Sequence, residues 1–291
     1  MRKANLEINL PRRLAVLLPL LLLLLPILWS RPATGGANFT LQAFDVGQGD
    51  SSLMQCGRTQ ALIDGGPDRT VLARLGRSMP FTDTTIEYVF LTHPHDDHLF
   101  GLFAVLERYE VGALVVSEYV EELELGRELV DLADELEVPV VTARSGDTFA
   151  VGDCGRLEVL WPVAGADRLT RGSRDEVNDR SLVLQLDGAD GEPQALLTGD
   201  AGTTVEDWLV ENGRLEPIRI LKVGHHGSRY STETDFLRAV DPDEAVIPVG
   251  ENAYGHPARI ILDRLDVFGI QTWRTDHDGT AIFDLDPEPS E

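Results

Sequence analysis

Short apolar runs alternate with amphipathic stretches along most of the chain, beginning at Phe39. Short runs rich in β-branched and aromatic residues are typical of strands, and apolar residues spaced three or four apart are typical of helices. The pattern predicts strands at 39–44, 51–56, 61–63, 86–91 and 113–117 and several between 140 and 161, with helices at 68–77, 99–109 and 121–137. Alternating strands and helices predict an α/β fold.

Three segments of the first half recur in the second half. One of them is the strand that ends in His93, which aligns without gaps with a strand that ends in His225. Two similar halves that face each other predict a four-layer αββα sandwich, with two mixed sheets inside and helices outside. Both histidines would then approach one cleft between the sheets. The matching pairs are 51–55 with 181–185, 60–63 with 194–197, and 86–93 with 218–225.

The first residues carry a different pattern, because an uninterrupted apolar run from Leu14 to Trp29 follows a basic segment and precedes small and turn-forming residues at 32–37. This order is typical of an export signal. We expect residues 1–36 to be a cleaved signal or an uncleaved signal anchor. The rest would then lie outside the cytoplasm, with the membrane contacted only through this segment. Residues 37–286 form the predicted domain, and the tail at 287–291 is predicted to be disordered.

The chain is strongly acidic, since 49 Asp and Glu residues outnumber 25 Lys and Arg residues and the formal net charge is −24. Residues 1–36 hold five basic groups and one acidic group, so the predicted domain carries about −28. Tight nonspecific binding of nucleic acid requires many cations that neutralise phosphates, and this charge argues against it. A phosphoester substrate, DNA included, would be attracted by bound metal ions rather than by a basic groove.

The chain has two cysteines, Cys56 and Cys154, which lie far apart in the sequence. In an oxidising compartment they could form a disulfide bond. Each could equally be a small buried apolar residue. The sequence leaves both alternatives open.

The segment His93-Pro94-His95-Asp96-Asp97-His98 places three imidazoles and two carboxylates between a predicted strand and a predicted helix. Imidazole nitrogen and carboxylate oxygen are the ligands that zinc and similar divalent cations prefer. Pro94 biases His93 toward extended backbone, which lets the loop turn and bring His93 and His95 to one ion. The segment therefore predicts a metal site.

Ligands for a second ion follow from the same pattern. Asp97 and His98 begin the next turn and could reach a second ion. Asp200 follows a strand of the second half, where its carboxylate could bridge the two ions because Gly199 permits close backbone approach. His225 would complete the second site.

Six motifs in this order resemble the metallo-β-lactamase superfamily, and specifically the stand-alone relatives of the C-terminal domain of ComEC-type competence proteins. The match extends over roughly residues 39–285. The resemblance implies hydrolytic chemistry at a site with two divalent ions, of which zinc is expected first and manganese second. The motifs are FDVGQGD (44–50), LIDGG (62–66), LTHPHDDH (91–98), LLTGD (196–200), VGHHGS (223–228) and NAYGHP (252–257).

One position departs from many hydrolases of this superfamily. Where these have a third histidine for the first ion, this chain has Asn178, and amide groups are poor zinc ligands. ComEC-like domains resemble the chain here and β-lactam hydrolases do not, so antibiotic hydrolysis is not expected. The expected substrate-binding residues are Asn178, Lys222, Ser228, Tyr254 and His256.

The resemblance also implies residues that orient the metal-ligand side chains. Asp45, Asp50 and Asp64 would orient ligand side chains by accepting their hydrogen bonds, although Asp45 and Asp64 could instead cap turns.

Three residues are expected to take part in catalysis: Asp97, His226 and His256. His226 could be a metal ligand, a proton donor or a solvated neighbour of His225, and we expect it to face the substrate. His256 begins a predicted helix and could contact a phosphate or occupy a turn. His277 is expected to lie in a hairpin turn.

Together these features predict an exported dinuclear metal-dependent hydrolase, most simply a phosphodiesterase or nuclease. Two alternatives remain open within enzymes: hydrolysis of a cell-envelope phosphoester, and hydrolysis of a non-phosphate substrate such as a lactam or thioester. A non-catalytic accessory role in DNA uptake is the third alternative. In the phosphodiesterase, His226 or His256 would protonate the leaving alkoxide.

Overall fold

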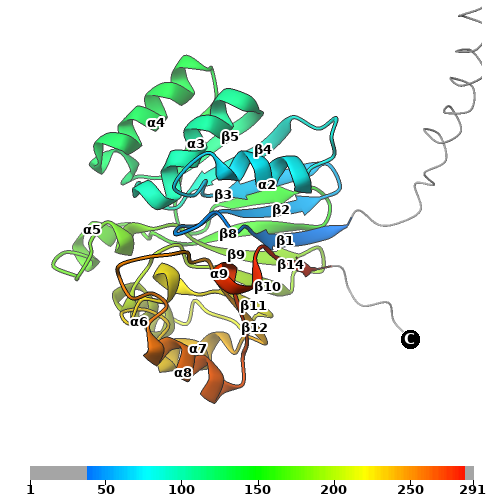
Figure 1. Cartoon of the computed structure of the whole chain (residues 1–291). Coiled ribbons are helices and arrows are strands. Elements are labelled where there is room, and N and C mark those ends of the chain that lie inside the picture. The colour runs from blue at the N-terminus through cyan, green and yellow to red at the C-terminus, as the bar shows by residue number, and fades with distance from the viewer. Residues whose placement is uncertain (1–37, 286–291) are drawn as a thin grey trace, which may run out of the picture. The chain divides into compact units, whose positions relative to one another are not determined.

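The computed structural model describes residues 38–285, which form two seven-stranded sheets (Figure 1). The first sheet has the order β14-β1-β2-β3-β4-β5-β6 and the second the order β13-β12-β11-β10-β9-β8-β7. The first contains β1 (Phe39–Ala43), β2 (Ser52–Cys56), β3 (Thr59–Ile63), β4 (Thr85–Leu91), β5 (Glu110–Ser117), β6 (Val140–Ala143) and β14 (Ala281–Asp284). The second contains β7 (Thr148–Val151), β8 (Gly155–Trp161), β9 (Val183–Gly188), β10 (Pro193–Leu197), β11 (Ile220–Lys222), β12 (Glu244–Ile247) and β13 (Gln271–Arg274).

The two sheets repeat one topology. In the first sheet, strand pairing is antiparallel from β14 to β3 and parallel from β3 to β6. In the second, it is antiparallel from β7 to β10 and parallel from β10 to β13. The recurrence seen in the sequence therefore corresponds to equivalent strands: β2 with β9, β3 with β10, and β4 with β11.

Three hydrophobic cores separate four layers. Phe90 and Leu184 belong to the core between the sheets, which is built from residues of both. Leu99 belongs to the core between the first sheet and its helices, and Phe236 to the corresponding core of the second sheet. Helices α2 (Thr70–Ser78), α3 (Asp96–Arg108) and α4 (Glu124–Glu135) cover one side, and α6 (Thr203–Glu211), α7 (Thr234–Val240) and α8 (Arg259–Phe268) cover the other (Figure 1).

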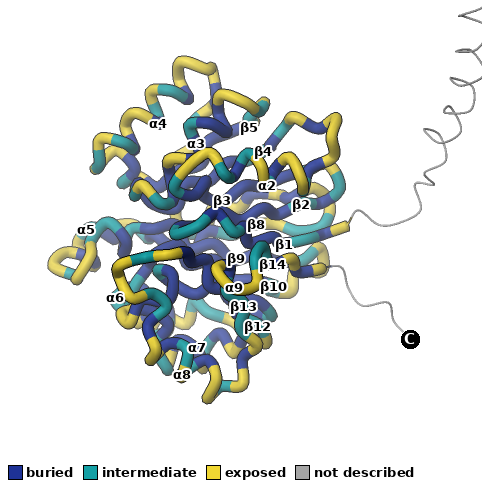
Figure 2. Tube along the Cα trace, viewed as in Figure 1, coloured by how far each residue is buried: buried dark blue, intermediate teal, exposed yellow. Residues whose placement is uncertain are grey.

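This arrangement confirms the predicted four-layer αββα sandwich with mixed sheets. The burial pattern follows it, because strands are mostly buried and the outward faces of the helices are exposed (Figure 2). Amphipathic helices on half-buried sheets are stabilised mainly by the apolar surface that they remove from water. The remaining helical turns are α5 (Ala166–Leu169), α9 (Thr275–Asp278), η1 (Val120–Glu122), η2 (Asn178–Arg180) and η3 (Gly224–Gly227).

Three local predictions differ from the structure. Helix α3 begins at Asp96 rather than residue 99, because two carboxylates in the first turn suit the positive end of the helix dipole. The single helix predicted at 121–137 is divided into η1 and α4 at Leu123, whose backbone is extended. The hairpin turn predicted around His277 is wrong, since this residue lies in α9, which connects β13 of one sheet to β14 of the other.

Cys56 and Cys154 form a disulfide bond, with their Cα atoms 5.9 Å apart. Cys56 ends β2 in the first sheet, and Cys154 lies in the turn between β7 and β8 of the second. The bond therefore links the two sheets covalently, which decides between the two alternatives that the sequence left open.

The predicted export signal at residues 1–36 and the predicted tail at 287–291 lie outside the described residues. Within residues 38–285, no helix is long and apolar enough to span a bilayer.

Candidate metal centre

The candidate centre lies where strand ends from the two sheets meet. The segment that follows β4 holds Thr92 and His93, the segment that follows β10 holds Asp200, and Lys222 ends β11. The Leu182 amide, just before β9, donates to the Thr92 carbonyl at 2.9 Å and links the two sheets at this point. The topology therefore brings together residues more than one hundred positions apart in sequence.

Close backbone contact places helix α3 against the end of β3. A Cβ atom on Gly101 would lie 1.9 Å from the Gly65 carbonyl oxygen, and one on Gly65 would lie 2.5 Å from the Leu102 amide nitrogen. Neither position has room for a side chain. Because this contact fixes the position of α3 relative to β3, it also fixes the positions of Asp97 and His98 in the first turn of the helix.

Asp200 lies at the centre of the cluster and is 2% exposed. Its carboxylate oxygens approach nitrogen atoms from both halves of the fold. The distances are 3.3 Å to His98 Nε2, 3.5 Å to His226 Nε2, 3.6 Å to Lys222 Nζ, 3.8 Å to His225 Nε2 and 3.9 Å to His93 Nε2. Asp200 therefore has the central position expected of a bridging carboxylate.

Hydrogen bonds set the orientation of two histidines. His98 Nδ1 donates to Asp64 Oδ2 at 2.8 Å, which leaves Nε2 as the acceptor nitrogen. The Thr92 hydroxyl donates to the same Asp64 oxygen at 2.7 Å and lies 3.1 Å from His93 Nδ1, from which it can accept. Both rings direct Nε2 toward the centre, and with Nδ1 as the donor a neutral ring would present a free Nε2 to a metal ion, as metal-ligating histidines do. His95 Nδ1 lies 3.0 Å from His93 Nε2.

His226, rather than His225, occupies the buried position beside Asp97. His226 Nδ1 donates to the Pro248 carbonyl at 2.9 Å, and Nε2 lies 3.2 Å from Asp97 Oδ2. The side chain of His225 is 29% exposed and contacts Asn178, whose Nδ2 lies 3.2 Å from its Nδ1. The sequence predicted His225 as a ligand of the second ion and His226 as a residue that faces substrate; in the structure His226 is the more buried of the two, and both line the cavity described below.

Three buried polar atoms of this cluster lack hydrogen-bond partners among the described residues and could coordinate divalent metal ions. His98 Nε2, His226 Nε2 and Asp200 Oδ1 are buried and have no hydrogen-bond partner among the described residues. Buried polar atoms without a partner are costly, and a coordinated cation would satisfy all three. Two groups have ligand atoms within 4.8 Å of one another: His93, His98 and Asp200, and Asp50, His98 and His226. These clusters are consistent with a dinuclear metal site.

The charges of the cluster compensate one another. Burial acts to raise the pKa of Asp200, but the imidazoles of His226 and His98 hold it well below its ordinary value. Burial acts to lower the pKa of His226, but Asp200 and Asp50 raise it to about 10. Burial lowers the pKa of His93 well below its ordinary value, which keeps it in the neutral form that binds metal.

Four further residues that the sequence predicted to orient ligands or to bind substrate do not line the cavity described below: Asp45, Asp50, Lys222 and Ser228. Asp50 contacts His226 Nδ1 at 3.2 Å and pairs with Lys222, which is itself 2% exposed. Lys222 therefore lies behind the ligands and does not face substrate. Ser228 is buried and is absent from the walls of the cavity described below. Asp45 forms an ion pair with Arg74 at 2.9 Å, away from the ligands that it was expected to orient.

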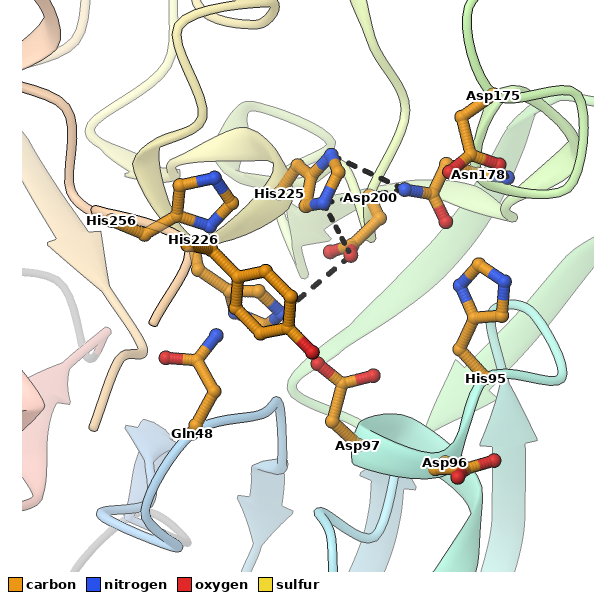
Figure 3. Close-up of a pocket in the computed structure, with 11 residues that line it drawn as sticks. Gln48, His95, Asp96, Asp97, Asp175, Asn178, Asp200, His225, His226 and His256 are labelled. Carbon is orange, nitrogen blue, oxygen red and sulfur yellow. Dashed lines mark hydrogen bonds and ion pairs between the residues drawn. The ribbon is translucent and has the colours of Figure 1, made fainter. Parts of the chain in front are cut away.

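A cavity of about 360 Å³ opens above the ligands (Figure 3). Asp97, Asp200 and His226 line it, and His225 and Asn178 occupy one wall (Figure 3). The other predicted residues on its walls are His95, Tyr254 and His256. The cavity therefore gives substrate access to the cluster.

Three residues near the centre had no role in the sequence prediction. Gln48 and Asp175 line the cavity, and Thr92 connects His93 to Asp64. Gln48 lies within the FDVGQGD motif and Thr92 directly before the histidine segment, so motif position was a usable signal for both. Asp175 lies in the long connection between β8 and β9 and carries no such signal.

Known proteins resemble this chain in sequence and fold. The family model described as the metallo-beta-lactamase superfamily matches residues 44–251. ComE operon protein 3 of Bacillus subtilis (strain 168) is 28% identical over 258 residues, which cover 82% of this chain and 32% of that protein. Competence protein ComA of Neisseria gonorrhoeae is 34% identical over 134 residues, 45% of this chain and 19% of that protein. The chain thus spans about a third or less of the length of these relatives.

The fold also occurs in a solved structure. CmlA, a diiron beta-hydroxylase from Streptomyces venezuelae, superimposes with a TM-score of 0.53 and 16% sequence identity. The match covers 86% of this chain and 55% of that protein. At this identity the similarity shows the shared fold alone.

Proposed function

The chain belongs to the metallo-β-lactamase superfamily, and on that premise we propose that it is an exported dinuclear metal-dependent hydrolase that cleaves phosphodiester bonds. One observation carries this proposal: a buried carboxylate, Asp200, lies among inward-directed imidazole nitrogens at the base of an open cavity. Buried ionisable groups beside a cavity are characteristic of catalytic sites.

The residues divide between two ions. We assign His93 and His95 to the first, with His225 beside them, and Asp97, His98 and His226 to the second, with Asp200 between the two. Imidazole-rich ligand sets favour zinc, and the carboxylates also permit manganese. Two divalent ions held by these residues would supply Lewis-acid chemistry, which polarises phosphoryl oxygens and activates water.

His256 contributes a hydrogen bond rather than a proton. Burial, with repulsion from His225 and His226 where these rings are protonated, lowers the pKa of His256 to about 4, so it is neutral near pH 7. A group with this pKa is a poor general acid at neutral pH. Its Nδ1 is buried without a partner among the described residues, which leaves it free to orient a substrate or water group.

The substrate and the location rest on separate support. One relative of the chain, competence protein ComA of Neisseria gonorrhoeae, carries a name that refers to competence, which favours DNA as the phosphodiester. The acidic composition requires that the bound ions supply most of the attraction for phosphate. The basic and apolar N-terminal pattern and the Cys56–Cys154 disulfide both support export to an oxidising compartment.

The test is a hydrolysis assay of the wild type beside Asp200→Ala, with added zinc or manganese. The substrates are bis(p-nitrophenyl) phosphate, linear and circular DNA, and a chromogenic cephalosporin. We expect phosphodiester cleavage that falls at least about 100-fold in Asp200→Ala, because this change removes the central ligand.

Other outcomes identify the alternatives. Cleavage of the cephalosporin alone would support the non-phosphate hydrolase and contradict our proposal. A protein that binds DNA but hydrolyses none of these substrates would be an accessory factor. Elemental analysis should find about two ions per wild-type chain and fewer in Asp200→Ala, a result that does not depend on activity.

A further inference from the structure

A second cavity, of about 220 Å³, adjoins the cavity above the metal centre. The two share Asp175, Asn178, Asp200 and His225 in their walls. The second continues past His225 to Arg174, Tyr230 and the first turn of helix α6. A substrate bound at the centre therefore has a continuous path in this direction.

Arg174 is the arginine in the walls of the two cavities. The walls of the first cavity contain no Lys or Arg among the described residues, and Arg174 is the sole Lys or Arg among the described residues in the walls of the second. Its guanidinium carbon lies 3.7 Å from the centre of the Tyr230 ring. Within residues 38–285 no carboxylate approaches its guanidinium within ion-pair distance.

The stacked geometry leaves this cation available. A ring that covers one face of a guanidinium does not block its N–H groups, which lie in the guanidinium plane. Stacking also restricts the side chain, so less conformational entropy is lost when a ligand binds. Arg174 is therefore a pre-oriented cation with unused donors beside the metal centre.

Further unused donors lie at the start of helix α6. The amide of Thr203 donates to the Tyr230 carbonyl at 2.9 Å, but the Thr204 amide and both threonine hydroxyls have no acceptor among the described residues. Both threonines line the second cavity. An anion there would accept these donors and lie at the positive end of the helix dipole.

Three carboxylates, those of Asp175, Asp179 and Asp200, and the amide of Asn178 lie in the same walls. Asp179 Oδ1 accepts the Gly202 amide at 2.9 Å, and Asp175 Oδ1 accepts the Asn178 amide at 3.2 Å, so both are engaged in local structure. At the junction of the cavities, Asn178 is 3% exposed and its Oδ1 has no partner among the described residues. The junction thus holds a buried acceptor that a donor group of a bound substrate, but not its phosphate, would satisfy.

We propose that the second cavity binds the phosphate adjacent to the scissile phosphodiester of a nucleic-acid strand, with Arg174, Thr203 and Thr204 as its ligands. This inference rests on the proposed phosphodiesterase function and adds the direction in which the bound strand leaves the metal centre. The strand would pass from the metal centre past His225 toward Tyr230, and a flanking phosphate would contribute to binding.

The test compares two substrates that differ by one phosphate. Thymidine 5′-(p-nitrophenyl phosphate) and its 3′-phosphorylated form present the same scissile group. We expect the wild type to favour the 3′-phosphorylated form about tenfold in kcat/KM, the effect of one partly exposed charge-assisted contact. In Arg174→Gln this ratio should fall to about one, and Thr204→Val should lower it in part. The control is Arg171→Gln, an exposed arginine outside both cavities, which should keep the wild-type ratio.

Calorimetry separates this inference from the proposed function. Thymidine 3′,5′-bisphosphate should bind the metal-loaded wild type about tenfold more tightly than thymidine 5′-monophosphate, and Arg174→Gln should remove the difference. If the wild type hydrolyses neither ester, the phosphodiesterase proposal fails, and binding still decides the subsite. If the wild type shows no preference for the ligand with the second phosphate, or if Arg174→Gln keeps that preference unchanged, the proposed phosphate subsite is overturned.

Discussion

At the scale of residues, the centre depends on backbone conformations that most side chains avoid. His225 and His226 both have left-handed φ angles, 48° and 52°. Such residues cost free energy and persist where the surrounding structure determines them, often at functional sites. Here the two rings point to different parts of the cluster, so one turn supplies a buried imidazole beside Asp97 and a more exposed one beside Asn178.

Asp64 is a buried carboxylate that holds two neighbouring residues, Thr92 and His98, in place. It accepts hydrogen bonds from His98 and from the Thr92 hydroxyl and amide. We expect Asp64→Asn to lower the affinity for divalent ions by about 10- to 100-fold, because the amide cannot accept all of these bonds. The measurement is a metal titration against a chromophoric chelator.

The control for this prediction is Asp187→Asn. Asp187 is also buried, but it pairs with Arg156 at 2.9 Å and lies away from the ligands. Equal metal affinity in the wild type and Asp64→Asn would show that Asp64 does not orient His98 as described.

At the scale of elements, helix α3 carries two of the candidate ligands, Asp97 and His98, and Gly101 determines where the helix lies. We expect Gly101→Ala to lower the free energy of unfolding by about 1–3 kcal/mol and to weaken metal binding, since the new methyl group would meet the Gly65 carbonyl. The measurements are urea unfolding and metal titration.

The matched change is Gly76→Ala on α2. A Cβ atom there has nothing within 4 Å, so the substitution should raise the free energy of unfolding by about 0.5–1 kcal/mol through helix propensity. Equal stabilities of the two variants would contradict the close contact between α3 and β3.

Glu206 connects helix α6 to the start of α7. Its carboxylate accepts the amides of Thr232 and Glu233, yet burial raises its pKa from 4.5 to about 8. Between these pH values the folded state keeps a proton that the unfolded state has released. The contribution of Glu206 to the free energy of unfolding therefore decreases as pH rises through this window.

We expect Glu206→Gln to remove this dependence, because an amide does not titrate. Urea unfolding at pH 5, 6, 7 and 8 should show the wild type losing stability relative to the variant as pH rises. Glu211→Gln, an exposed change in the same helix, should follow the wild type. A constant difference between the wild type and Glu206→Gln would refute the assignment.

At the scale of the whole molecule, the disulfide joins the two halves across the central core. Its cysteines are separated by 98 residues in sequence. Closing a loop of this length restricts the unfolded chain, so we expect reduction to lower the free energy of unfolding by about 2–5 kcal/mol.

Urea unfolding with and without dithiothreitol measures this effect. The double variant Cys56→Ser/Cys154→Ser should match the reduced wild type and should not respond to dithiothreitol. An oxidised wild type no more stable than the double variant would mean that the bond does not support the fold.

Much of the architecture and several ligands were predictable from the sequence. Periodicity located most strands, and the recurrence of 86–93 at 218–225 indicated equivalent strands in two sheets. The histidine segment and Asp200 were recognisable because each directly follows a buried strand. These features depend on local patterns of burial, and such patterns are visible in residues that are adjacent in the sequence.

Tertiary structure decided what depends on contacts across the sandwich. It set His226 rather than His225 beside Asp97, buried Lys222 behind the ligands, and brought Arg174 next to the centre. It also paired Cys56 with Cys154. In each case the partners come from separate segments of the chain. The relative position and orientation of these segments follow from how sheets and helices pack. A pattern of neighbouring residues carries no information about that packing.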